Sequence, residues 1–524
     1  MRGNKSAAVS TGRHIMPVIA ISLITVVSAV VGLNLALPDI ARRTGASQAE
    51  LTWIVDAYTV VFAALLFFAG ALGDRFGRKP LLAIGLAVFG LAALVGTTVS
   101  EPWQLIAVRA VMGLAASAVM PTTLSVITTS FPERERPAAI GAWVGMAGAG
   151  AILGLLVTAV LLQYFEWPAI FWLNVGLAAA ALIGTLARVP DSTEANPAPI
   201  DLGGGVLALL GFGGLVFGII EGPVRGWGDP WTVSSLAAGV LGLGAFVWWE
   251  LGRAHPLLDP RLFRDRRFGS GALALTTTFF VWFGVIFMVV QYLQFVVGYS
   301  PLMTAACLLP IPFFLLPTAR TAPKVAARLG YRRVVPIGML LLSAGLVVLS
   351  RLQVELTYWV FAVGLGLTAA GMGISGTPST TALTEALPEA KQGVASASND
   401  TARELGSALG IAVLGSTLNQ VYRDGLSGLL GGLPSQAVER ILGSVAFTQA
   451  PELSLLGPRG AALAQAGRQA FVDGVSRAFL VAAAVAVIAA LVVWLTAPRS
   501  PQGSPPPGMT AGAEPLAGRG RATT

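Results

Sequence analysis

Charged residues are scarce in this chain of 524 residues: they make up 11% of it, where a soluble domain has about 25%. Apolar residues make up 55%, and the chain has one cysteine and two histidines. Cys307 cannot form an internal disulfide or a thiolate metal cluster, and His14 and His255 lie outside the apolar segments. This composition excludes a soluble domain and indicates an all-α polytopic membrane protein without a metal or other cofactor. Since no cluster of histidine, cysteine or acidic residues is visible, we do not expect an enzyme.

The formal net charge is +8, but the basic residues fall in short segments between apolar stretches. In a membrane protein such residues mark the cytoplasmic side of the bilayer. We therefore read the positive charge as a topology signal, and nucleic acid is not an expected partner.

The apolar stretches recur at lengths close to the roughly 20 residues that a helix needs to cross a bilayer. They predict fourteen membrane-spanning helices, at residues 15–37, 51–72, 81–99, 103–127, 138–162, 168–187, 202–220, 231–250, 270–297, 302–319, 334–352, 357–377, 394–418 and 475–496.

An even number of spans places both termini on one side of the membrane. Most of the 34 Lys and Arg residues fall on that side, which predicts cytoplasmic termini in a cell (plasma) membrane, with the lipid bilayer as a partner.

The long outer loop, 419–474, holds either an amphipathic helix around residues 435–443 or a poorly ordered loop. The proline-rich end, 497–524, is expected to be a disordered cytoplasmic tail.

Three short motifs recur at nearly equal spacing, which predicts an internal duplication. Arg75-Phe-Gly-Arg-Lys is echoed by Arg328-Leu-Gly-Tyr-Arg-Arg, Pro121-Thr-Thr by Pro378-Ser-Thr-Thr, and Phe131-Pro-Glu by Leu387-Pro-Glu. The pairs relate spans 2 to 5 to spans 10 to 13 and leave spans 7 and 8 without a counterpart. We therefore predict two pseudo-symmetric six-helix bundles with two inserted helices. In order, the units are an N-terminal tail (1–14), a first bundle (15–187), a linker with the inserted pair (188–269) and a second bundle (270–496).

Several motifs together resemble the major facilitator superfamily, and within it the fourteen-helix drug:proton antiporters of the QacA/EmrB-like group. They are Gly70-x-Leu-x-Asp74-Arg75-x-Gly77-Arg78-Lys79, Ala36-Leu-Pro38, Trp53-Ile-Val-Asp56-Ala-Tyr58, Arg109-x-x-x-Gly113, Trp167-Pro-Ala-Ile-Phe-Trp-Leu-Asn174 and Asn399-Asp400-Thr-Ala-Arg403-Glu404-Leu-Gly406. The resemblance covers residues 15 to 500. It implies proton-driven export of lipophilic compounds by alternating access, with a bacterial source and a monomer as the working unit.

Two segments depart from that group. Its members usually carry an acidic residue in span 1, where this chain has Ala29. In span 5 the group's Gly-x-x-x-Gly-Pro-x-x-Gly-Gly is replaced here by Gly150-x-x-x-Gly154-Leu-x-x-Thr158-Ala. A helix without the proline keeps its hydrogen bonds and bends less. These departures leave open a symporter or facilitator of a small organic molecule in the same fold.

Ionisable residues deep inside a span are candidates for function because a charge there costs about 2.5 to 3.5 kcal/mol. Asp56 in span 2 and Arg109 in span 4 lie at similar depth, so they can form an ion pair. We expect Asp56 to bind and release the driving proton, and Arg109 to tune the pKa of Asp56. The alternatives are a static salt bridge between two helices in the outer half of the membrane, or a position of Asp56 at the hydrated interface.

The remaining candidates are a latch, a gate and a cavity. The residues of the span 2 to span 3 turn (Gly70, Asp74, Arg75, Gly77, Arg78 and Lys79) predict a conformational latch, or else a pure topology signal. A possible inner gate is formed by Asp400, Arg403 and Glu404, and Glu221 reads as an interfacial cap. A possible substrate cavity is lined by Trp53, Tyr58, Trp282, Phe287, Gln291 and Tyr292.

The chain lacks a phosphate loop for ATP. The sequence therefore predicts a secondary transporter that exports small lipophilic drugs, antibiotics or secreted metabolites in exchange for protons.

Overall fold

The computed structural model describes residues 3–131, 136–191, 201–254, 256–387, 392–449 and 457–498, and in these ranges the chain forms helices and no strand. The N-terminal helices are α1 (Gly3–Thr44), α2 (Gln48–Phe76), α3 (Arg78–Gly96), α4 (Pro102–Ser130), α5 (Arg136–Tyr164), α6 (Pro168–Arg188), α7 (Leu202–Arg225) and α8 (Pro230–Leu251). The C-terminal ones are η1 (Pro260–Arg264), α9 (Arg266–Gln291), η2 (Tyr292–Val296), α10 (Pro301–Cys307), α11 (Pro310–Leu329), α12 (Tyr331–Leu349), α13 (Tyr358–Glu385), α14 (Gln392–Ser427), α15 (Ser435–Gly443), η4 (Val445–Gln449) and α17 (Pro458–Thr496).

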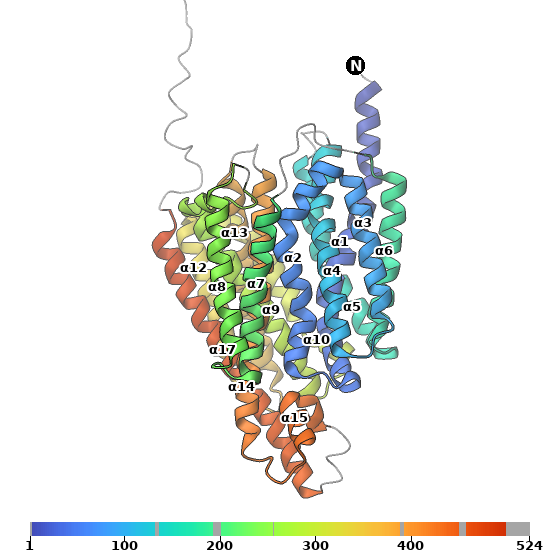
Figure 1. Ribbon diagram of the computed structural model, residues 1–524. Coiled ribbons are helices and arrows are strands. Elements are labelled where there is room, and N and C mark those ends of the chain that lie inside the picture. Colours follow the sequence, from blue (N-terminus) through green and yellow to red (C-terminus); the bar gives the residue numbers. More distant parts are fainter. Residues whose placement is uncertain are drawn as a thin grey trace, which may run out of the picture.

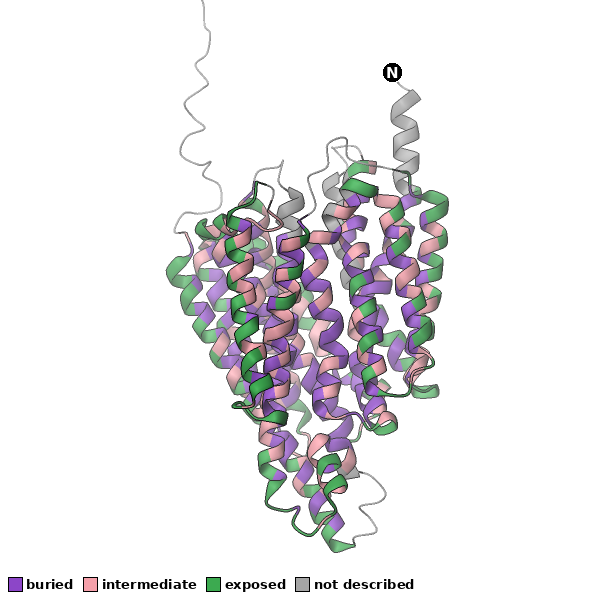
Figure 2. Ribbon diagram, viewed as in Figure 1, coloured by how far each residue is buried: buried purple, intermediate pink, exposed green. Residues whose placement is uncertain are grey.

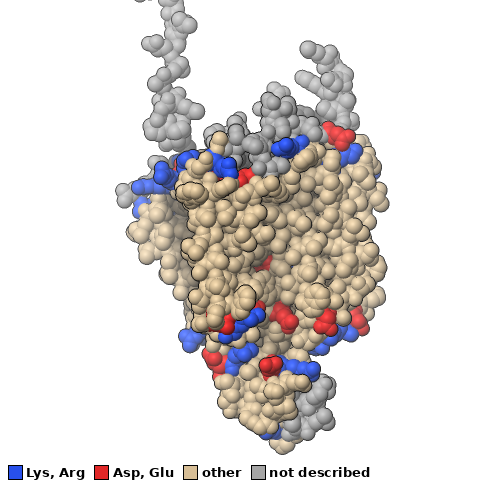
Figure 3. All heavy atoms as spheres, viewed as in Figure 1, with Lys and Arg blue, Asp and Glu red and all other residues tan. Residues whose placement is uncertain are grey.

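Helices cover the fourteen predicted spans, one of them as two consecutive helices, and within the described ranges 12 helical segments are long and apolar enough to cross a membrane. The two others are α5, of which Leu153–Tyr164 counts as a shorter apolar helix, and α14, which carries polar residues along its length. Charged side chains gather at the two ends of the bundle, while its flank is nearly free of them (Figure 3). The protein is therefore an all-helical, multi-pass membrane protein.

The helices pack in two groups (Figure 1). Helices α1 to α6 pack on one another, and α9 to α14 pack together with α17. The groups meet where α2 contacts α14, α1 contacts α9 and α5 contacts α10. The inserted pair has a different position: α7 packs on α8, α2 and α14, whereas α8 lies at the periphery with most of its surface exposed (Figure 2).

One end of the bundle carries a helical projection, and we call it the cap end (Figure 1). The projection contains the last turns of α14, then α15 and η4, and the start of α17. The Tyr422 hydroxyl on α14 donates to the Ile441 carbonyl on α15 at 2.9 Å. Helix α15 spans Ser435–Gly443, so the helix predicted there is confirmed and the alternative of a poorly ordered loop is wrong.

The opposite end of the bundle, here the basic end, holds two turns that the duplication relates. Gly77 links α2 to α3 with φ of 101°, and Gly330 links α11 to α12 with φ of 83°. In both turns one glycine in the positive-φ region ends one helix and begins the next. Only glycine adopts this backbone without strain, which explains its recurrence in both motifs.

The predicted span 302–319 is not one continuous helix. It is divided into α10 and α11, and Leu308 and Leu309 between them donate to Ala305 and Ala306 in tighter turns. Pro310 explains the break, because it lacks the N–H that would continue the helical ladder.

We expect Gly77→Ala to lower stability by about 1 to 3 kcal/mol, because a side chain is strained at this backbone conformation. The measurement is thermal unfolding of the detergent-solubilised protein. Gly176→Ala in α6 is the control, since a Cβ there has no atom within 4 Å. Equal stability of both variants would contradict the account of the turn.

Candidate functional site

Arg109 on α4 is 1% exposed and joins three helices. Its Nε donates to the Ile54 carbonyl of α2 at 3.1 Å, and its Nη1 donates to the Ala29 carbonyl of α1 at 3.2 Å. The guanidinium also lies over the Tyr58 ring, 4.3 Å from its centroid. A buried cation is thus held by backbone dipoles and an aromatic face.

Gly113 explains how α4 comes close enough to α2 for these bonds. It lies one helical turn after Arg109 on the same face. A Cβ at this position would collide with the carbonyl oxygen of Tyr58. The Arg109-x-x-x-Gly113 spacing therefore combines a long donor with a close backbone approach.

Asp56 does not pair with Arg109, so the ion pair that their equal depth allowed is wrong. The Asp56 side chain is fully buried, and neither carboxyl oxygen has a hydrogen-bond partner. The physical reason is direction around the helix axis. Arg109 binds α2 at Ile54, and two residues along a helix turn the side chain by about 200°, which points Asp56 away from α4.

Tyr58 on α2 contacts both α1 and the buried cation. Its hydroxyl donates to the Val26 carbonyl at 3.4 Å, and its ring lies under Arg109. Tyr58 therefore joins α2 to α1 beside Arg109.

The polar cluster of α14 is arranged around Arg403. Its Nη1 lies 3.8 Å from Asp400 Oδ1, and its guanidinium lies 4.6 Å from the ring centroid of Phe279 on α9. Asn399 Nδ2 donates to the same Asp400 oxygen at 3.3 Å. The three predicted gate residues are thus neighbours on one helix, and Arg403 pairs locally with Asp400.

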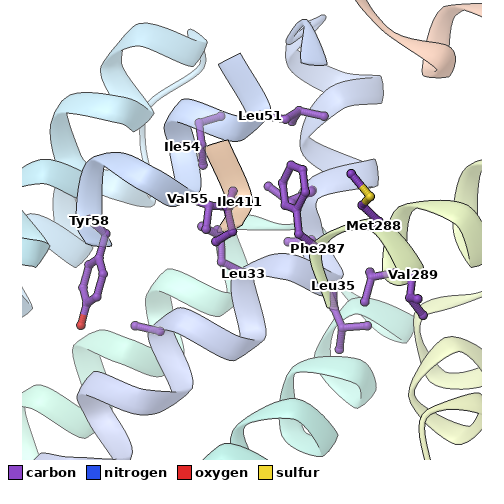
Figure 4. Close-up of a cluster of buried hydrophobic side chains, with 14 of the residues drawn as sticks. Leu33, Leu35, Leu51, Ile54, Val55, Tyr58, Phe287, Met288, Val289 and Ile411 are labelled. Atoms are coloured by element: carbon purple, nitrogen blue, oxygen red, sulfur yellow. The ribbon is translucent and has the colours of Figure 1, made fainter. Parts of the chain in front are cut away.

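Buried apolar side chains join the two groups toward the cap end (Figure 4). We call this cluster the seal; it includes Leu33, Leu35, Leu51, Ile54, Val55, Phe287, Met288, Val289 and Ile411. One polar bond crosses beside it, from Gln294 Nε2 to the Leu35 carbonyl at 3.0 Å. The two groups are therefore in direct apolar contact toward the cap end.

The predicted cavity residues do not line one open space in this conformation. Tyr58, Phe287, Gln291 and Tyr292 are fully buried in or beside the seal. Trp53 and Trp282 are half-buried, and Trp53 faces α7 with its ring 5.8 Å from that of Phe217.

The glycines of span 5 hold α5 against α1. A Cβ at Gly150 would lie 3.1 Å from Ile24, and one at Gly154 would lie 2.7 Å from Ser28. One turn further along, Thr158 packs against Gly32. The larger residue on α5 is therefore matched by a glycine on α1, so the close packing of the two helices survives the altered motif.

The latch residues are placed only in part. Gly70 and Asp74 lie within α2, but their surroundings are outside the described part of the structure. Arg75 is exposed beside the Phe76 ring at 5.8 Å, and Gly77 forms the positive-φ turn before Arg78 and Lys79. The latch stays a prediction.

One contact of the site was missed from the sequence. Trp53 Nε1 donates to Glu221 Oε1 at 3.1 Å, and Arg225 Nε donates to Glu221 Oε2 at 2.9 Å. Glu221 thus fixes α7 to α2, where the sequence suggested an interfacial cap. The four-residue spacing of Glu221 and Arg225 could have predicted the ion pair within α7, but no local pattern identifies a partner as distant in sequence as Trp53.

A bundle of membrane-length helices in two groups, with ionisable residues buried between them, is the architecture of a secondary transporter. A family model described as Major Facilitator Superfamily matches residues 19–411. The chain belongs to this superfamily, and it is a multi-pass membrane transporter.

Relatives match over most of their length. The chain is 31% identical to the multidrug resistance protein Stp of Mycobacterium tuberculosis, over 89% of this chain and 88% of the relative. It is 31% identical to the tetracenomycin C resistance and export protein of Streptomyces glaucescens, over 91% of each. It is 34% identical to the puromycin resistance protein pur8 of Streptomyces alboniger, over 76% of this chain and 80% of the relative.

Solved structures share the fold. A bacterial homologue of the lysosomal transporter Spinster, inward-facing and unoccupied, matches with a TM-score of 0.63 at 16% identity, over 93% of this chain and 96% of that one. The POT family transporter PepTSo matches with a TM-score of 0.60 at 15% identity, over 92% of this chain and 97% of that one.

We expect Arg109→Lys to lower both stability and transport. The ammonium of lysine cannot donate to carbonyls on two helices and stack on Tyr58 at once, and a hydrogen bond to a charged group is worth about 1.5 to 3 kcal/mol. Thermal unfolding in detergent and dye efflux from cells measure the two effects. Arg440→Lys on the cap helix α15 is the control. A variant with native stability would show that the carbonyl contacts do not hold the helices.

Proposed function

We propose that the protein exports lipophilic drugs or secreted metabolites across the plasma membrane in exchange for protons. The observation that carries this proposal is the similarity, over most of the chain, to proteins named for drug resistance and export. The buried ionisable residues support a mechanism for the proposal, because a carboxyl group can take up and release a proton. One proton moving inward across 100 mV releases about 2.3 kcal/mol.

The basic end of the bundle is the cytoplasmic side in this proposal, because short basic turns such as Arg75 to Lys79 stay inside. The cap end is then extracellular, and both termini are cytoplasmic. The closed seal supports assignment of this conformation to the inward-facing state. The bilayer is crossed fourteen times, with α5 and α14 completing the two six-helix bundles and α7 and α8 as the inserted pair.

The proposed cycle uses the two helix groups as rigid bodies. When the seal opens and the basic end closes, substrate leaves to the outside and Asp56 takes up a proton. On return, Asp56 releases the proton to the inside and substrate binds between the groups, near Tyr58 and the α14 cluster. Arg109 keeps α1, α2 and α4 together while the groups rock. The working unit is a monomer.

A symporter or facilitator is the second candidate, and Ala29 favours it because that position lacks the acidic side chain usual in the antiporter group. The two functions differ in the sign of proton movement. An antiporter releases protons from the lumen of everted vesicles when substrate is added, a symporter takes protons up with substrate, and a facilitator moves none.

In everted vesicles energised by respiration, we expect lipophilic dyes to evoke proton release from the lumen with the native protein. Asp56→Asn is expected to abolish that release because a side-chain amide does not take up and release a proton as a carboxyl group does. The control is Asp424→Asn, which changes a carboxylate that contacts Gln420 in the cap. Substrate-evoked release that is absent from native vesicles would exclude antiport, and an unimpaired Asp56→Asn would exclude Asp56 as the coupling residue.

The latch makes a separate prediction. Asp74→Asn should retain substrate binding and lose turnover, because a latch stabilises one conformation and does not contact substrate. Dye binding to the purified protein and efflux from cells measure the two. Equal loss of binding and efflux would indicate misfolding and contradict the latch.

A further inference from the structure

The two inserted helices have a defined place at the junction between the helix groups. Along α2, α7 is fixed by the bond from Trp53 to Glu221 and by its close approach at Gly205, where a Cβ would lie 3.5 Å from the Phe68 ring. On the other side, the Ser416 hydroxyl of α14 donates to the Ile219 carbonyl of α7. Helix α7 therefore contacts one helix of each group, and its contacts with α2 extend over most of its length.

Asp56 lies on the face of α2 that meets this junction. Thr52, one turn before it on α2, packs on Gly415 of α14, where a Cβ would lie 2.9 Å from the Thr52 hydroxyl. Trp53, three residues before it, bonds to α7. Val60, one turn after it, belongs to a buried cluster with residues of both helices, namely Val216 and Ile220 of α7 and Ala408 and Ala412 of α14. Residues three and four apart share a helix face, so Asp56 lies between these contacts.

The contacts on this face of α2 are mostly apolar. The carboxyl oxygens of Asp56 have no hydrogen-bond partner, and the buried cluster that includes Val60 supplies aliphatic side chains from α7 and α14, with the Ser416 hydroxyl bonded to the Ile219 carbonyl nearby. Helix α7 covers part of this face of α2. A buried carboxyl group without polar partners exchanges protons only when the side chains around it move apart and admit water.

We infer that α7 is the wall that isolates Asp56, and that Asp56 becomes accessible when α14 moves away from α2 and α7. This inference rests on the proposed function, because it assigns the inserted helices to proton coupling. Glu221 keeps α7 on α2 during the movement. Helix α8 supports α7 through close contacts at Gly211 with Leu243 and at Gly218 with Leu236, so the pair moves as one unit.

The test is a proton leak in liposomes that contain the purified full-length protein, with an imposed pH gradient and no substrate. Ile220→Ala shortens a side chain of the wall, and we expect it to raise the leak about ten-fold, the change that about 1.4 kcal/mol produces. The leak should return to the native level in Ile220→Ala combined with Asp56→Asn, because the proton then has no carrier in the junction.

The matched control is Leu241→Ala, which shortens an aliphatic side chain of α8 that is 72% exposed. It is expected to leave the leak unchanged. If Ile220→Ala does not fold, Trp53→Phe replaces it, since phenylalanine keeps an aromatic ring but loses the donor to Glu221. A leak that persists in the double variant, a leak in the control, or a folded wall variant without a leak would each overturn the inference.

Failure of the inference and failure of the proposed function give different results. If Asp56→Asn leaves substrate-evoked proton release intact, Asp56 is not the coupling residue and the proposed function loses its mechanism. If Asp56→Asn abolishes that release but the wall variants do not leak, coupling at Asp56 stands and α7 is not its wall.

Discussion

The constraint on which the structure depends is the cost of a charge at membrane depth. A cation there must find dipoles within the protein, because lipid offers none. Arg109 takes two backbone carbonyls from different helices and the face of Tyr58. These bonds require α1, α2 and α4 to lie at fixed distances, and Gly113 permits the closest of these approaches. The core of the first helix group is therefore organised around a single guanidinium.

The junction between the helix groups has the opposite character. The seal is made of aliphatic and aromatic side chains. One hydrogen bond, donated by the side-chain amide of Gln294, crosses beside it. Apolar surfaces can separate without leaving charges unpaired, whereas a buried ion pair across the junction would be costly to break. Among the described residues the ion pairs thus lie within a group or within the inserted pair, and the surface between the groups is mostly apolar. This division suits an interface with two alternative arrangements.

The sequence allowed prediction of features that depend on local pattern. Spans follow from the length of apolar stretches, α15 follows from its amphipathic period, and the related turns at Gly77 and Gly330 follow from motif spacing. The ion pair of Asp56 with Arg109 was wrong because depth along a helix does not fix direction around it. The Trp53 to Glu221 bond and the packing of Thr158 on Gly32 were missed because each joins helices whose neighbours the sequence does not reveal.

The change at position 29 is compatible with the site, because Arg109 uses the carbonyl of Ala29 and not its side chain. A carbonyl holds the guanidinium but does not exchange a proton, so coupling in the proposed mechanism needs another group. Deep in the described helices the acidic candidates are Asp56, Asp400 and Glu404. Asp400 contacts Arg403 of its own helix, so this contact does not depend on the position of another helix. Asp56 lacks a hydrogen-bond partner and, in the proposed mechanism, lies where α2, α7 and α14 meet, so that movement of the groups would change its surroundings. That difference favours Asp56 as the residue whose protonation follows the conformation.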